Sequence, residues 1–218
     1  MENTAYTLNQ EGLRKLALGQ FSEAYEMFEQ AVHNDPSFAE SYCNMANMLG
    51  SIGKSEDASR LFQRTIALDP TMTIAYYGLA NSYYNLGQYS QAILFYQTAK
   101  QMGMEHEDLE YMLGMAHFSL NHLEEALIHF DQSLALRPND VDVLFYKGIA
   151  LAGLGQMENA KQILELLLRS KPDHIDAHYN LGIAHYLEGD IETATGYFER
   201  VLELNPEHLL AKKALEDM

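Results

Sequence analysis

The prolines of this 218-residue chain recur at a fixed interval, which limits the fold more than any other feature of the sequence. The five positions are Pro36, Pro70, Pro138, Pro172 and Pro206. Every interval between neighbours has the same length except the second, from Pro70 to Pro138, which is twice as long. In the middle of that gap a proline is due, and the chain has Met104. Self-similarity at a period of about 20–50 residues is typical of a solenoid built from stacked copies of one unit.

Four other residue series keep the period of the prolines through six units. An alanine series comprises Ala24, Ala58, Ala92, Ala126, Ala160 and Ala194. A small-residue series comprises Gly12, Ala46, Ala80, Gly114, Gly148 and Gly182. A turn series comprises Gly19, Gly53, Gly87, Asn121, Gly155 and Gly189. A bulky series comprises Phe28, Phe62, Tyr96, Phe130, Leu164 and Phe198. Four series in one register indicate six copies of a single unit.

Each series has a physical interpretation. Alanine and the small residues are expected where two helices approach closely. The Gly/Asn position predicts a tight turn with positive φ between the two helices of a unit. The residue after each proline, such as Ser37 or Thr71, is predicted to be the N-cap of the next helix. Apolar residues recur at helical spacing in between, as in "FSEAYEMFEQAV". The sequence therefore predicts an all-α solenoid of helix–turn–helix units in one domain over residues 1–218.

The sequence resembles the tetratricopeptide repeat (TPR) family, and the stretch "AYYGLANSYYNLGQYSQAILFYQTA" follows the family pattern. The repeats are placed at about residues 5–38, 39–72, 73–106, 107–140, 141–174 and 175–208. The segment "HLLAKKALEDM" is similar to the family's terminal capping helix, at about residues 207–217. The resemblance implies a right-handed superhelix of antiparallel helix pairs. It also implies a protein-interaction module that holds an extended or helical peptide in a concave groove, and no enzyme activity.

Composition narrows the choice of partners and compartment. The chain has 14 Lys and Arg against 31 Asp and Glu, a net charge of −17, which argues against nucleic acid and against anionic membrane surfaces. Neutral, apolar or basic protein segments remain as partners. No run of about 18 apolar residues predicts a membrane span, and the N-terminal "MENTAYTLNQ" does not resemble a signal peptide. A single cysteine, Cys43, excludes an internal disulfide, and a cytoplasmic protein is expected.

One face of the first helix in each unit, at positions 2, 5, 9 and 12, corresponds to the groove lining of the family. One in three of the residues at these positions is aromatic, against 11% of the whole chain, and none is Lys or Arg. We call this set the groove stripe, and it predicts an aromatic groove with an acidic edge. The candidate peptide-binding residues are Asn44, Asn47, Tyr77, Asn81, Tyr84, Tyr111, Met115, Phe118, Phe145, Tyr179 and Tyr186.

Ordinary packing is the alternative interpretation of the groove stripe. Residues at positions 5, 9 and 12 also contact the neighbouring repeat, and aromatic stripes at helical spacing usually belong to a core. Asn47 and Asn81 occupy one position in successive repeats, with Asn44 one turn before Asn47. An amide can donate to and accept from a peptide backbone, so these residues are candidates for capture of an extended segment.

Other kinds of site are not supported by the sequence. The absence of Lys and Arg from the stripe excludes the carboxylate clamp of TPR co-chaperones. His174, His178 and His185 have a spacing that invites a metal hypothesis, but a zinc site needs three or four converging ligands. No catalytic or metal-binding residues and no cofactor are therefore predicted. Cys43 has no basic neighbour to activate it, although its stripe position should make it accessible to labelling reagents.

Two alternatives to a peptide-binding adaptor stay open at this point. The chain enters its first repeat without a separate capping helix, so a solenoid end could support weak self-association. The chain could also be an accessory subunit of an enzyme complex.

The missing proline lies within an unbroken register, because Ala92 and Ala126 on either side of it keep the spacing of the rest of the alanine series. Gly103 is expected to end one helix in the left-handed conformation, and the next helix is expected to start at "EHED" with Glu105 as its N-cap. This junction of the third and fourth repeats is therefore predicted to be the softest in the array. If its backbone is compatible with proline, Met104→Pro should stabilise the protein by about 0.4–1 kcal/mol.

Overall fold

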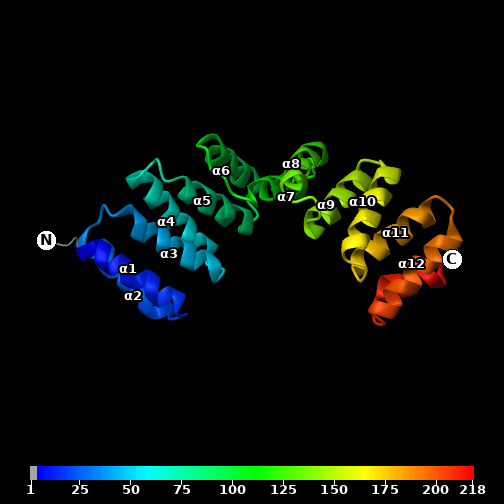
Figure 1. Cartoon of the computed structure of the whole chain (residues 1–218), viewed down its shortest axis with the longest axis horizontal. Coiled ribbons are helices and arrows are strands. Elements are labelled where there is room, and N and C mark those ends of the chain that lie inside the picture. Colours follow the sequence, from blue (N-terminus) through cyan, green and yellow to red (C-terminus); the bar gives the residue numbers. More distant parts are fainter. Residues whose placement is uncertain (1–3) are drawn as a thin grey trace. The chain divides into compact units, whose positions relative to one another are not determined.

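The computed structural model describes residues 4–218, which form 13 α-helices and no strand (Figure 1). The first six are α1 (Thr4–Ala17), α2 (Phe21–Asn34), α3 (Ala39–Ser51), α4 (Ser55–Leu68), α5 (Thr73–Asn85) and α6 (Tyr89–Gln101). The other seven are α7 (Leu109–Ser119), α8 (Leu123–Leu136), α9 (Val141–Gly153), α10 (Met157–Ser170), α11 (Ile175–Leu187), α12 (Ile191–Leu204) and α13 (Leu209–Glu216). The predicted all-α array of antiparallel helix pairs is confirmed.

The chain consists of two compact units, residues 1–109 and 110–218. The first unit, described from residue 4, contains the pairs α1–α2, α3–α4 and α5–α6. The second contains three more pairs and α13, with only the first residue of α7 assigned to the first unit. The boundary between the units falls in the stretch that lacks the proline. The prediction of a single domain over the whole chain stays a prediction.

The turn within each pair is closed by one residue in the left-handed region, as predicted. Five are glycines with φ between 72° and 82°, and the sixth is Asn121 with φ of 59°. The residue after each of them donates its N–H to the carbonyl five residues earlier, as Gln20 does to Lys15 at 3.0 Å. A left-handed residue therefore reverses the chain and satisfies carbonyls at the helix end.

The two helices of a pair are held together by the small and bulky series. Phe28, Phe62, Tyr96, Phe130, Leu164 and Phe198 are all 2% exposed or less. Opposite these side chains there is no space for a larger residue: a Cβ added to Gly182 would lie 2.7 Å from Phe198 Cε1. At Gly114 the corresponding distance to Phe130 Cδ1 would be 2.6 Å. The close helix approach expected from the sequence is confirmed.

The predicted N-caps are displaced by one residue. The residue that starts each first helix lies two places after the proline, as Asp140, His174 and His208 do for α9, α11 and α13. Ser37, predicted to be a cap, instead donates its N–H and its hydroxyl to Asp35 Oδ1, at 2.9 and 2.6 Å. The loop carboxylate thus uses the Ser37 donors within the turn and leaves the cap position to the next residue.

The stretch without proline has its own geometry. Gly103 has φ of 82°, which confirms the left-handed helix end, and Met104 donates its N–H to Ala99 O at 3.0 Å. The next helix does not start at Glu105 as expected, because α7 begins at Leu109. His106 organises the turn in between: its Nδ1 accepts the Asp108 N–H at 3.2 Å, and its carbonyl accepts the Leu109 N–H at 3.0 Å. The expected stabilisation by proline required a compatible backbone, and the hydrogen-bonded Met104 amide contradicts that condition.

Met104→Pro is therefore expected to lower the free energy of unfolding by about 1 kcal/mol or more, because proline removes the N–H that caps α6. Urea denaturation followed by circular dichroism measures the change. Met104→Ala, which keeps the N–H, is the control. A Met104→Pro protein as stable as the control would contradict the hydrogen bond to Ala99.

Two glycines give a matched test of helix packing. Gly182→Ala should lower the free energy of unfolding by about 1–3 kcal/mol, because its methyl group would overlap the buried Phe198 ring. Gly196→Ala should raise it by about 0.5–1 kcal/mol, because a methyl group at this site in α12 meets nothing within 4 Å and alanine favours the helix. Equal effects in urea denaturation would show that the Gly182–Phe198 contact does not limit the packing.

Candidate functional site

The groove stripe forms a pocket between α11 and α13 in the second unit. It has a volume of about 220 Å³, and Tyr179, Ile183 and Tyr186 of the stripe line it. The other lining residues are Phe198, Leu210, Lys213, Ala214 and Asp217. Tyr186 is 39% exposed, so an aromatic edge is open to a ligand.

Sequence reasoning missed one cation at this pocket. Lys213 lies one repeat length after Tyr179, so α13 continues the groove stripe beyond the sixth repeat. Asp217 stands in the same relation to Ile183. The stripe as defined from the sequence covers six complete repeats only, which is why it lacks Lys and Arg. Within residues 4–218, the Lys213 side chain has no hydrogen-bond or ion-pair partner, so its ammonium group can interact with a ligand in the pocket.

Aromatic residues at position 5 of the stripe pack on the histidine that ends their own repeat. The ring centroids of Phe145 and His174 are 5.1 Å apart, and those of Tyr179 and His208 are also 5.1 Å apart. Each of these histidines also caps a helix, since His174 Nδ1 accepts the Ala177 N–H at 3.1 Å. His208 Nδ1 does the same for α13. The rings therefore fix both the stripe aromatics and the helix starts.

In the first unit, the same packing of a position 5 aromatic residue on a histidine encloses Tyr77. Tyr77 is only 8% exposed, and its ring lies 4.5 Å from His106 and 5.6 Å from Tyr96 between centroids. Burial, with a smaller contribution from the Asp108 carboxylate, raises the pKa of Tyr77. Burial raises the pKa of Tyr96 strongly, so its neutral hydroxyl acts as a donor, and it donates to Asn81 Oδ1 at 2.6 Å.

The candidate asparagines differ in whether other residues already form hydrogen bonds with their amide groups. Asn44 Nδ2 donates to Asn9 Oδ1 at 2.9 Å, and the buried Asn9 oxygen also accepts from Ser41 Oγ at 2.9 Å. Asn44 thus joins the first two repeats, and the oxygen of Asn81 is used by Tyr96. Asn47 is exposed, and its amide nitrogen lies 3.7 Å from Cys43 Sγ, a weak acceptor. Asn47 is therefore the asparagine best placed for an external ligand.

The remaining stripe candidates are divided between core and surface. Met115 is 9% exposed and belongs to the core. Four others are half-buried and make aromatic or further contacts inside the array: Tyr84, Tyr111, Phe118 and Phe145. Tyr84 packs edge-on against Tyr89, with ring centroids 5.3 Å apart. The structure therefore brings Tyr179 and Tyr186 together at one pocket and gives Tyr77 and Met115 mainly packing roles.

The three histidines considered for a metal have other partners. His174 caps α11, His178 Nε2 lies 2.8 Å from Pro172 O, and His185 Nδ1 lies 3.1 Å from Asp190 Oδ2. No group of three or more His, Cys, Asp or Glu side chains in residues 4–218 is arranged to hold a metal ion. In the same range, no helix is long and apolar enough to cross a membrane.

Comparison with known proteins identifies the family. Family models described as "Tetratricopeptide repeat" match residues 27–58, 117–183 and 175–208. A family model described as "Anaphase-promoting complex, cyclosome, subunit 3" matches residues 53–133. The crystal structure of YrrB, "a TPR protein with an unusual peptide-binding site", is 30% identical, with a TM-score of 0.77 over 87% of this chain and 97% of YrrB. The chain belongs to the tetratricopeptide repeat family.

More distant TPR structures share the fold. Pseudomonas aeruginosa pilF is 19% identical, with a TM-score of 0.77 over 99% of this chain and 98% of that one. The C-terminal part of a TPR repeat-containing protein from Cytophaga hutchinsonii is also 19% identical, with a TM-score of 0.79 over 98% and 88% of the two chains. No curated protein matches the chain. The TPR fold is in general a scaffold for protein–protein interaction.

Cys43 does not have the accessibility expected from its stripe position. It is 4% exposed, and burial raises its pKa to about 11. Because the thiolate is the reactive form, iodoacetamide at pH 8 should modify Cys43 about a hundredfold more slowly in the folded protein than in urea. Mass spectrometry of timed samples measures both rates. Equal rates would contradict the buried position.

Proposed function

We propose that this TPR protein is an interaction adaptor that captures a peptide segment of a protein partner at the pocket between α11 and α13. The proposal is supported mainly by the pocket itself, where Tyr179, Ile183 and Tyr186 form an apolar wall open to solvent. Aromatic walls of this kind provide a large contact area around a buried anchor side chain. A volume of about 220 Å³ suits one large apolar or aromatic side chain of an extended or helical peptide.

The charge along the stripe of the second unit favours neutral or basic peptides. On α9, α11 and the end of α13, the stripe carries the carboxylates of Asp142, Asp176 and Asp217 against the single ammonium group of Lys213. Asp142 and Asp176 also lie in the first turn of their helices, where they stabilise the helix dipole without any ligand. Their negative potential still attracts a basic segment, most strongly at low ionic strength.

The relationship to YrrB gives independent support. YrrB is described as having an unusual peptide-binding site, and its identity of 30% extends over 97% of its length. Association through a solenoid end, and a role as an accessory subunit of an enzyme complex, stay predictions.

Selection from a displayed library of random peptides tests the proposal. Enriched peptides should share a large apolar residue with neutral or basic neighbours, and fluorescence anisotropy of a labelled peptide should give saturable binding. Tyr186→Ala should weaken this binding by about tenfold, because it removes an exposed wall of the pocket. Ile128→Ala, at a 58% exposed residue of α8 outside the pocket, is the control.

Two results would contradict the proposal. One is the absence of any enriched peptide. The other is a peptide whose binding Tyr186→Ala leaves unchanged while the variant remains folded by circular dichroism. Asp176→Asn separates the charge effect, since it should reduce the salt dependence of binding for basic peptides and leave neutral peptides unaffected.

A further inference from the structure

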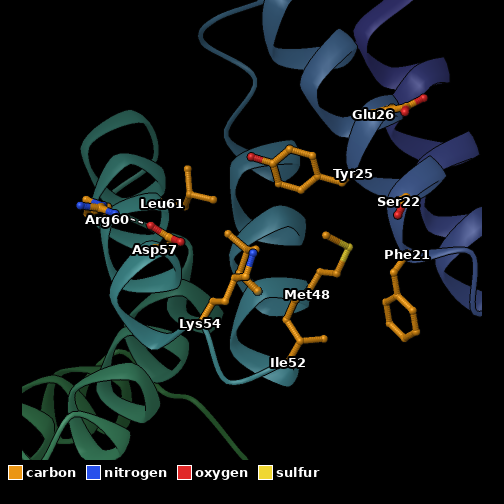
Figure 2. Close-up of a pocket in the computed structure, with 11 residues that line it drawn as sticks. Phe21, Ser22, Tyr25, Glu26, Met48, Ile52, Lys54, Asp57, Arg60 and Leu61 are labelled. Atoms are coloured by element: carbon orange, nitrogen blue, oxygen red, sulfur yellow. Dashed lines mark hydrogen bonds and ion pairs between the residues drawn. The ribbon is translucent and has the colours of Figure 1, made fainter.

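The first unit has a second pocket that does not belong to the groove stripe. It lies between α2, α3 and α4 and has a volume of about 660 Å³ (Figure 2). Its lining residues are Phe21, Ser22, Tyr25, Glu26, Met48, Leu49, Ile52, Lys54, Asp57, Arg60 and Leu61. Figure 2 shows Phe21 and Ile52 at one end and Tyr25 and Leu61 at the other, with Met48 between them. We call this surface the α2–α4 patch.

Large apolar side chains are left in solvent at one end of the α2–α4 patch. Phe21 is 47% exposed and Ile52 is 50% exposed. At the other end, Tyr25 and Leu61 are half-buried and leave a hollow beside the buried Met48. The patch therefore combines protruding apolar groups with an apolar recess, and exposed groups of this kind mark interaction surfaces.

The charges of the patch balance, which is unusual for this chain. The patch contains two carboxylates, Glu26 and Asp57, and two cations, Lys54 and Arg60. The whole chain has 31 acidic residues against 14 basic ones, so most of its surface would repel a second copy. The α2–α4 patch is locally neutral and does not oppose self-association.

Two of these charged side chains have no partner within residues 4–218. Arg60 forms an ion pair with Asp57, whereas the exposed side chains of Lys54 and Glu26 have no hydrogen-bond or ion-pair partner. Figure 2 shows Glu26 toward the Tyr25 end of the patch and Lys54 toward the Ile52 end. A two-fold axis that lies in the interface, across the line joining these two ends, would set the Lys54 end of one copy against the Glu26 end of the other. The same arrangement would bring the end with Phe21 and Ile52 to the end of the other copy that has the recess.

The corresponding groove three repeats later does not share these features. It lies between α8, α9 and α10, has a volume of about 380 Å³ and contains the ion pair Lys147 Nζ–Asp131 Oδ1 at 2.6 Å. Gln156 stands there in place of Lys54, and Asn159 in place of Asp57. The exposed apolar groups and the unpaired charges of the α2–α4 patch are thus not found in this equivalent groove and are not imposed by the repeat.

We infer that the α2–α4 patch is a self-complementary interface through which two copies of this chain form a symmetric dimer. In a two-fold interface each contact occurs twice, so Lys54 of each copy pairs with Glu26 of the other. Phe21 and Ile52 of each copy fill the recess formed by Tyr25 and Leu61 of the other. This association involves the first unit and is independent of peptide capture at α11 and α13.

Analytical ultracentrifugation over micromolar to submillimolar concentrations tests the inference. The wild-type mass should rise from that of one chain to that of two. Phe21→Ser should raise the dimer dissociation constant by about tenfold or more, because the anchor is lost from both halves of the interface. Ile191→Ser, at the same repeat position and 42% exposed in the second unit, should leave the dissociation constant unchanged.

Charge reversal tests the proposed pairing directly. Lys54→Glu alone and Glu26→Lys alone should each weaken the dimer, because each places like charges opposite each other. The double variant should restore association, and Gln156→Glu is the matched control for Lys54→Glu. A wild type that stays monomeric would overturn the inference. So would a dimer that Phe21→Ser does not weaken, or single reversals that the double variant does not rescue.

Discussion

The contact between a small residue of one helix and a buried large side chain of the next is the constraint on which the array depends. In the sixth repeat, Gly182 gives Phe198 the space to lie between its two helices. In the second repeat, Ala46 takes the small position, and the close contact shifts to Gly78 of the following repeat, where an added Cβ would lie 2.2 Å from Phe62 Cζ. The bulky ring therefore determines both how a pair closes and how closely the next pair can stack.

Most of the fold could be predicted because its main constraints repeat. One contact between a small and a bulky residue and one left-handed turn, both repeated six times in the same register, specify the helix pairs and the buried bulky side chains. Non-repeating polar contacts were harder to predict. The Asp35 side chain accepts from Ser37 and thereby shifts the cap by one residue, and His106 organises a turn that delays α7 to Leu109. Such effects depend on the direction of a single side chain, which residue type and spacing do not specify.

The candidate site was predicted less completely than the core. The stripe included Tyr179 and Tyr186, because their positions correspond to the groove lining of the family. It could not separate an exposed amide from one used between repeats, since Asn44 and Asn47 are chemically identical and differ only in their neighbours. Lys213 was missed for another reason: it belongs to a helix outside the six complete repeats, although the repeat register leads directly to it. Extending a repeat register into its flanking helix would have found it.

The left-handed turn inside each pair has a consequence for how the chain folds. Because every pair reverses within a few residues, a helix meets its first packing partner without closure of a long loop. An array with such local contacts can begin to fold at any pair and extend to the neighbouring ones, and proteins rich in local contacts fold quickly. Asn121 is the one non-glycine residue among the six turn positions, so the α7–α8 turn adopts the left-handed conformation at a higher conformational cost than the others. Folding should therefore start less readily at α7–α8 than at the pairs closed by glycine.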